Sequence, residues 1–165
     1  MGVYNVHERR LAGSRGEVGT LIDRLAGGQD ALWPHDAWPR MRFDGALGVG
    51  ASGGHGPVRY HVAAYVPGTW VRFTFDGPRG FDGFHEYAVL PADAGRTMLR
   101  HTLAMRARGP ARLTWPLLWR PLHDALLEDS LDRAERALTG TVRTPARWTP
   151  YVRLLRGLAG RPGAR

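Results

Sequence analysis

The chain has 165 residues, which is the usual size of one domain with a core of its own. All 23 basic residues are arginine, and the absence of lysine and cysteine excludes disulfides, thiolate metal sites, cysteine nucleophiles and Schiff-base lysine chemistry. The formal net charge of +8 belongs mostly to the C-terminal end: residues 1–140 carry 17 arginines and all 15 acids, whereas residues 141–165 carry 6 arginines and no acid.

Membrane insertion and nucleic-acid binding find little support in this composition. No apolar run approaches the roughly 20 residues that a membrane span needs. The N-terminal segment MGVYNVHERR lacks the apolar core of a signal peptide, so we expect a cytoplasmic protein. Because residues 1–140 are nearly neutral, we expect no nucleic-acid partner; the alternative is binding through the arginine-rich tail.

The chain begins with a strand followed by a helix. Residues 3–11 alternate imperfectly in a β-favouring composition and predict the first strand. Ser14 and Glu17 then form an S-x-x-E capping box, and an apolar helix face follows until Gly27 and Gly28 end it.

A tryptophan-rich segment comes next. Residues 30–39 predict a second short helix or a pair of turns, since Pro34 and Pro39 interrupt the segment. Trp33 and Trp38 are large apolar side chains that need a place to be buried.

Residues 41–49, 58–66 and 69–75 predict the second, third and fourth strands. The turn dipeptide Pro67-Gly68 indicates a hairpin between the last two of these. Alternation along this hairpin places one set of side chains on its inner face. These are Tyr60, Val62, Ala64, Val71, Phe73 and Phe75.

The glycine-rich stretch GVGASGGHGP, residues 48–57, invites comparison with a phosphate-binding loop. It contains no G-K-[ST] and precedes a strand instead of a helix, so we interpret it as a flexible connection between strands. Ser52 and His55 are minor candidates for contact with a ligand.

Two further alternating segments, FHEYAVL and TMLRHTLAM, predict a final hairpin around the turn PADAG. With the turn centred on Asp93, His85 lies opposite His101, and both project from the inner face. Two histidines in an apolar surrounding are candidates for proton transfer, or are ordinary core histidines hydrogen-bonded to neighbours. The same register pairs Tyr87 with Leu99 and Val89 with Thr97 and turns Leu103 and Met105 inward.

From about residue 117 the apolar spacing becomes helical and predicts one long helix. Pro121 should kink or restart this helix, which leaves Trp115, Leu118 and Trp119 as an entrance or lid, or as core residues. One buried stripe and two i,i+4 ion pairs follow from the spacing. The stripe is His123, Leu127, Leu131, Ala134 and Leu138, and the pairs are Asp129 with Arg133 and Asp132 with Arg136.

These elements predict an α+β helix-grip fold: a curved, antiparallel six-stranded sheet wrapped around a long C-terminal helix, with two short helices after the first strand. Residues 1–140 form the domain, and residues 141–165 form a basic amphipathic tail.

The order of these strands and helices resembles that of the SRPBCC and START-like superfamily, which includes polyketide cyclases, aromatases and birch-pollen-allergen-type proteins. LWPHDAWPRMRFD, GVGASGGHGP and FDGFHEYAVLPADAGRTMLRHTLAM carry the resemblance, which covers residues 3–140. It implies a hydrophobic ligand held between sheet and helix.

We therefore expect the protein to bind, or to bind and transport, a lipid, a polyketide or another apolar molecule. The alternative is an aromatase/cyclase-like enzyme in which His85, His101 or Tyr87 moves protons. The expected cavity residues come from both hairpins and the long helix. They are Tyr60, Val62, Val71, Phe73, Phe75, His85, Tyr87, Leu99, His101, Leu103, Met105, Trp119, His123 and Leu127.

We expect no cofactor and no metal, because His61, His85, His101 and His123 lack any compact ligand spacing. No G-x-S-x-G motif supports a serine hydrolase.

In the tail, the apolar residues from Trp148 onward have helical spacing, with Thr149 as the expected cap and Pro150 in the first turn. This basic helix suits contact with an anionic membrane surface; the alternatives are docking on its own domain, a dimer contact or a frayed tail.

Overall fold

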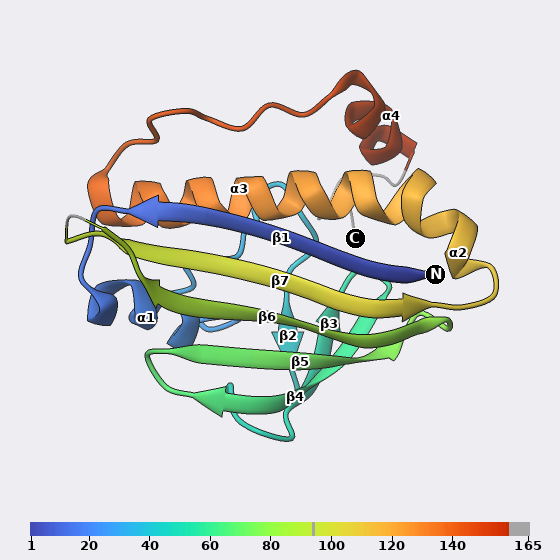
Figure 1. The fold of residues 1–165 in the computed structure, drawn as a ribbon, viewed down its shortest axis with the longest axis horizontal. Helices are drawn as coiled ribbons and strands as arrows, with labels where there is room; N and C mark the ends of the chain where they lie inside the picture. The colour runs from blue at the N-terminus through green and yellow to red at the C-terminus, as the bar shows by residue number, and fades with distance from the viewer. Residues whose placement is uncertain (94, 159–165) are drawn as a thin grey trace.

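The computed structural model describes residues 1–93 and 95–158. A seven-stranded antiparallel sheet, in the order β1-β7-β6-β5-β4-β3-β2, curves around a long helix that runs beside β1 (Figure 1). The strands are β1 (Gly2–Leu11), β2 (Arg42–Phe43), β3 (Ser52–His55), β4 (Val58–Val66), β5 (Trp70–Gly77), β6 (Phe81–Pro91) and β7 (Thr97–Ala107). The helices are α1 (Arg15–Asp23), α2 (Ala111–Thr114), a π-helix (Trp115–Trp119), α3 (Arg120–Thr139) and α4 (Pro150–Leu158). The predicted helix-grip architecture is therefore confirmed, with differences in strand number and in the N-terminal helices.

The capping box at the start of α1 is formed as predicted. The backbone N–H of Glu17 donates to Ser14 Oγ, and the backbone N–H of Ser14 donates to the Glu17 carboxylate over 2.8 Å. The helix ends at Asp23, before the two glycines that the sequence indicated. Of the two alternatives for residues 30–39, the second short helix is wrong and turns are present: the Asp30 carboxylate accepts the N–H groups of Leu32 and Trp33.

The predicted second strand, residues 41–49, is also wrong in extent. β2 covers only two residues, and the glycine-rich stretch expected to be a flexible connection contains β3, so the sheet has seven strands. A Cβ on Gly53 would lie 2.0 Å from the Arg42 carbonyl oxygen, and one on Gly54 would lie 2.0 Å from that of Val58. The glycines thus permit close backbone approach, and they erase the apolar alternation by which a strand is recognised.

The β4–β5 hairpin turns at Pro67-Gly68 as predicted, with Gly68 at φ 68°. A register shift between Val62 and Ala64 reverses the faces beyond it. Ala64, expected to point inward, lies opposite Arg72 instead. Tyr65 takes the inner position and donates its hydroxyl to Asp23 over 2.7 Å.

The β6–β7 register differs from the predicted one by two residues. Val89 lies opposite Leu99, Tyr87 opposite His101, and His85 opposite Leu103, because the loop between Pro91 and Thr97 is longer than assumed. A two-residue shift preserves the face on which each side chain lies. His85 and His101 consequently still share the inner face as diagonal neighbours.

The long helix starts through a π-helical turn, where Pro116 and Pro121 interrupt the regular pattern. Pro121 has no N–H to offer the Leu117 carbonyl, which instead accepts the hydroxyl of Tyr151 over 2.6 Å. Neither predicted i,i+4 ion pair occurs among the described residues. The α3 acids and Arg133 bind other elements instead: Asp129 accepts two indole N–H groups, Asp132 pairs with Arg9, and Arg133 pairs with Asp36.

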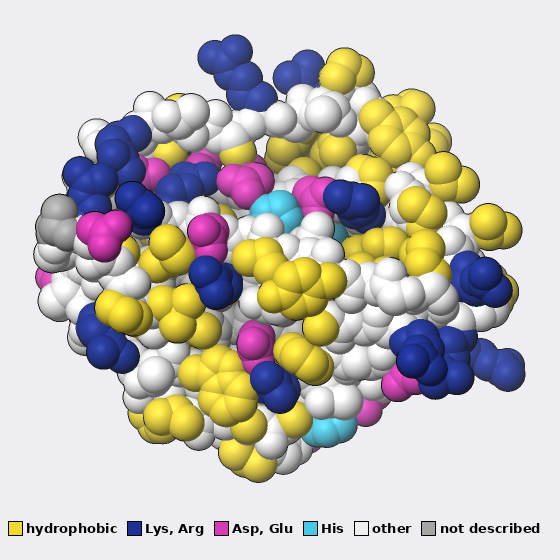
Figure 2. All heavy atoms as spheres, in the orientation of Figure 1, with side chains coloured by type: hydrophobic (Ala, Val, Ile, Leu, Met, Phe, Trp, Pro, Cys, Tyr) yellow, Lys and Arg dark blue, Asp and Glu magenta, His cyan; other side chains and the backbone are white. Residues whose placement is uncertain are grey.

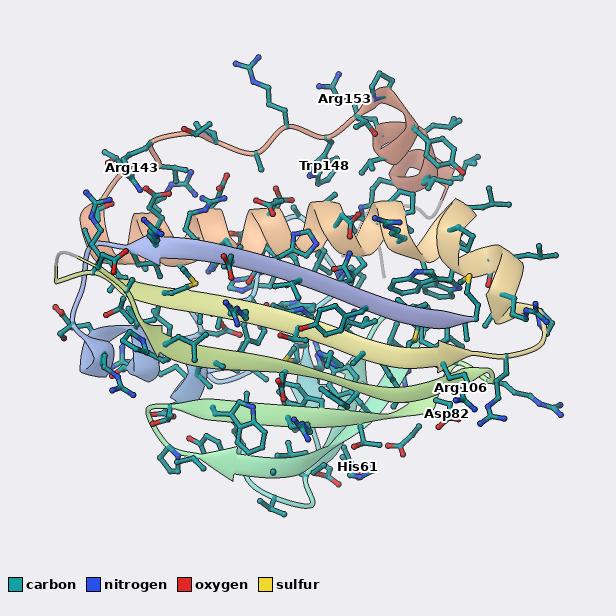
Figure 3. The ribbon with its side chains drawn as sticks, viewed as in Figure 1. His61, Asp82, Arg106, Arg143, Trp148 and Arg153 are labelled. Atoms are coloured by element: carbon teal, nitrogen blue, oxygen red, sulfur yellow. The ribbon has the colours of Figure 1, made fainter. Side chains whose placement is uncertain are left out.

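The tail forms the predicted helix and packs on the domain. The Val152 N–H donates to the Thr149 hydroxyl that caps α4, and the Val152 side chain is only 3% exposed. In Figure 3, Trp148 points from the segment between α3 and α4 toward α3, whereas Arg153 points away from the rest of the domain. Docking on its own domain is thus the alternative that the structure supports; membrane contact through the outer face of α4, where Leu154 is exposed, stays a prediction. Among the described residues, no helix has the length and apolarity of a membrane span.

Candidate functional site

A cavity of about 410 Å³ lies between the inner face of the sheet and the helices that cross it. Most of its wall is aromatic or aliphatic, and four histidines interrupt the apolar surface. The wall consists of Trp33, Trp38, Pro39, His55, Gly56, Pro57, Val58, Phe75, Phe81, His85, His101, Leu103, Trp115, Leu118, Trp119, Leu122, His123, Leu126, Leu127 and Arg156.

Half of the residues expected at the cavity line it. They are Phe75, His85, His101, Leu103, Trp119, His123 and Leu127. Trp33, Trp38, Trp115 and Leu118, for which the sequence left burial or a lid role open, also form wall. His55 lines the cavity as well, whereas Ser52 is exposed and lies outside it.

The other half lie in the packed core instead of on the wall. Those side chains are Tyr60, Val62, Val71, Phe73, Tyr87, Leu99 and Met105, all 6% exposed or less. The hydroxyl of Tyr87 lies 2.9 Å from that of Ser130, which donates to the Leu32 carbonyl. Tyr87 is therefore committed to joining the sheet to α3, and its predicted role in proton transfer gains no support from this geometry.

The sequence reasoning missed wall residues contributed by turns and by the tail. Pro39 and Pro57 lie beside the short strands β2 and β3, which the periodicity did not reveal, and Val58 lies opposite His55 of β3. Arg156 was missed because only docking of α4 brings it to the cavity, and the alternation and helical spacing of one segment carry no information about where that segment docks.

The central polar feature of the cavity is a pair of histidines. His85 Nδ1 lies 3.2 Å from His101 Nε2, while His85 Nε2 and His101 Nδ1 have no hydrogen-bond partner among the described residues. In a neutral pair, one ring donates to the other. Whichever ring donates, the two remaining nitrogens then comprise one donor and one acceptor.

Burial keeps these histidines neutral. It lowers the pKa of His85 and His101 well below the usual value, and neighbouring histidines reinforce the shift. Burial likewise lowers the pKa of His55 to about 3 and lowers that of His123. A neutral imidazole offers hydrogen bonds without requiring a counter-ion, which suits an uncharged part of a guest.

A second histidine cluster joins β1 to α3 beside the cavity. His7 Nδ1 lies 2.7 Å from the Glu128 carboxylate and His7 Nε2 lies 3.1 Å from that of Asp124. Burial alone would lower the pKa of His7, but the two carboxylates outweigh it and raise the pKa to about 9. Ligand atoms of His7, His123 and Asp124 lie within 4.8 Å of one another, a grouping that could hold a metal and that the sequence spacing did not reveal. Since two acids already bind both His7 nitrogens, the arrangement suits a protonated imidazole.

The two histidine groups predict a stability maximum near pH 6.5. Because the folded-state pKa of His7 is raised, its contribution is complete below pH 6.5 and is lost as the pH rises to about 9, a loss on the order of 2 kcal/mol. Below pH 6.5 the unfolded chain protonates histidines that the folded chain keeps neutral, so stability falls again.

Urea denaturation between pH 5 and 9.5 measures this profile. His7→Gln should flatten the alkaline side, because it removes the imidazole that the two carboxylates keep charged. A wild-type alkaline slope that survives in His7→Gln would contradict the assignment.

A larger hollow of about 1030 Å³ lies between α3 and the segment that leads to α4. Most of its charged side chains are already paired with one another: Arg9 binds Glu128 and Glu135, and Arg143 binds Glu135. These ion pairs tie β1, α3 and the connecting segment together. We therefore place the candidate site in the smaller apolar cavity.

Comparison with solved structures supports the fold. The chain is similar to norcoclaurine synthase of Thalictrum flavum in complex with dopamine and hydroxybenzaldehyde, with a TM-score of 0.63, 14% identity, and coverage of 87% of this chain and 90% of that one. It is also similar to CalU16 of Micromonospora echinospora (TM-score 0.57, 11% identity, 94% and 82% covered) and to a Thermobifida fusca protein (TM-score 0.61, 16% identity, 87% and 99% covered). No protein-family model and no curated protein matches the sequence.

The fold is thus the helix-grip fold that the sequence resemblance indicated, and norcoclaurine synthase and CalU16 share it. At these identities the likeness establishes the architecture and leaves ligand and activity to be argued from the cavity.

Proposed function

We propose that the protein binds an apolar, aromatic small molecule in the cavity between the sheet and α3. The observation that carries this proposal is the cavity itself: about 410 Å³, walled by tryptophan, phenylalanine and leucine side chains around a neutral histidine pair. A pocket of this size and lining is typical of small-molecule sites. The aromatic guests of norcoclaurine synthase, dopamine and hydroxybenzaldehyde, show that a similar fold accommodates such molecules.

The second candidate function is catalysis of a cyclisation or an enolisation on a polyketide-type substrate. The His85–His101 contact favours it, because a neutral pair that offers one donor and one acceptor can accept a proton from one guest atom and return another elsewhere. Such an exchange leaves the net charge of the pair unchanged. Binding requires only the cavity, whereas turnover requires both histidines.

Tryptophan emission provides the test, since Trp33, Trp38, Trp115 and Trp119 all line the cavity. We expect naphthalene-type aromatics to quench this emission saturably with a dissociation constant in the micromolar range, equivalent to about 8 kcal/mol. His101→Gln should change affinity less than about tenfold but abolish any turnover of an enolisable ketone. Non-saturable quenching identical to that of free tryptophan would contradict cavity binding.

A further inference from the structure

Arg156 is a cation in the wall of a cavity that is lined mostly by apolar side chains. It lies on α4, and its guanidinium carbon is 4.6 Å from the centroid of the Trp38 ring and 5.9 Å from that of Trp148. These contacts place the guanidinium against the Trp38 ring and within cation–π range of Trp148 at the cavity wall.

The guanidinium has fewer polar partners than it can bind. One terminal nitrogen donates to the Ala37 carbonyl, while its buried Nε has no hydrogen-bond partner in residues 1–93 and 95–158. Within the same residues, no carboxylate lies within 4.0 Å of Arg156. Asp129 is near enough to influence it electrostatically, but its Oδ2 atom already accepts the indole N–H groups of Trp38 and Trp148, each over 2.8 Å.

This environment differs from that of the other partly buried arginines. Arg9 has three carboxylate partners and Arg133 pairs with Asp36. At Arg156, by contrast, burial lowers the pKa and Asp129 offsets this only in part. A cation withdrawn from water without an acid beside it is costly, and the guanidinium fork matches a carboxylate in shape and charge.

We infer that the guest is an aromatic or aliphatic carboxylic acid whose carboxylate pairs with Arg156 while its apolar body fills the cavity. This inference rests on the proposed function and names the chemical class of its ligand. The neutral histidines then contact uncharged parts of the guest, and Arg156 supplies the positive charge that balances the carboxylate. Because Arg156 belongs to α4, binding also fastens that helix to the domain.

The test compares 1-naphthaleneacetate with its methyl ester, two probes of nearly the same shape, by titration calorimetry at pH 7. Wild-type protein should bind the acid at least about tenfold more tightly than the ester, because only the acid can form a charge-assisted hydrogen bond with Arg156. Arg156→Gln should reduce that preference to within about twofold, and Arg156→Lys should keep part of it. Arg153→Gln is the matched control, since Arg153 lies on the same helix and points away from the body (Figure 3).

The wild-type comparison stands even if Arg156→Gln fails to fold. Equal affinity of acid and ester for the wild type would overturn the inference while cavity binding stands. If neither probe binds, the result contradicts both the carboxylate inference and the proposed function. An acid preference that survives in Arg156→Gln would also overturn the inference, because the charge would then be recognised elsewhere.

Discussion

Replacing Leu118 and Leu122 together by tryptophan should lower affinity for any cavity guest by about a hundredfold or more, equivalent to roughly 2.7 kcal/mol. Both side chains line the cavity, and they stand one helical turn apart where the π-helix joins α3. Each is half-buried, so the larger rings can enter the existing space instead of displacing packed core. Calorimetric titration with 1-naphthaleneacetate measures the effect.

The chain offers a closely matched control. Leu113 and Leu117 also stand one turn apart on the same helical segment, but they are 71% and 63% exposed. In Figure 2, hydrophobic side chains gather at the end of the molecule where α2 and α4 lie. Leu113→Trp with Leu117→Trp adds the same bulk outside the cavity and should keep wild-type affinity; equal loss in both double variants would show that the cavity is not where the guest binds.

Gly19→Ala should destabilise the protein by at least about 3 kcal/mol. Gly19 lies in α1, where its missing side chain lets the helix touch the β4–β5 turn backbone to backbone. A Cβ at this position would lie 2.1 Å from the carbonyl oxygen of Gly68 and 2.7 Å from its Cα. Asp23, later in the same helix, accepts the Gly68 N–H over 2.8 Å, so α1 and the turn cannot separate without breaking that bond.

Gly16→Ala in the same helix provides the comparison. Nothing lies within 4 Å of the position that its Cβ would occupy, and alanine favours helix over glycine. We expect a gain of about 0.5–1 kcal/mol there. Urea denaturation of both variants separates close packing from helix propensity: a small effect at Gly19 would show that the turn moves aside easily.

Local patterns predicted most of the fold. Alternation located β1, β4, β5, β6 and β7, and the Ser14–Glu17 capping box located α1. The inner-face position of His85 and His101 survived an incorrect register, because a two-residue shift returns each side chain to its face.

The predictions that were wrong concerned features that depend on contacts between distant segments. β3 is glycine-rich. It joins the sheet because its glycines let neighbouring backbones come close, and it carries no alternating side-chain pattern from which a strand could be predicted. The α3 acids were assigned to neighbours on their own helix, but Trp38, Arg9 and Trp148 reach them from elsewhere. Arg156 joined the cavity only through the docking of α4, which no spacing within residues 141–165 foretells.

Native mass spectrometry tests the central claim most directly. Wild-type protein and the Leu118→Trp/Leu122→Trp variant would be incubated with the same cellular extract of small molecules, desalted and weighed intact, and then denatured to release any bound compound. We predict one bound molecule per wild-type chain, carrying an aromatic or aliphatic carboxylic acid, and none on the variant. A wild-type chain that takes up nothing, or that takes up the same compounds as the variant, would contradict a ligand-binding cavity.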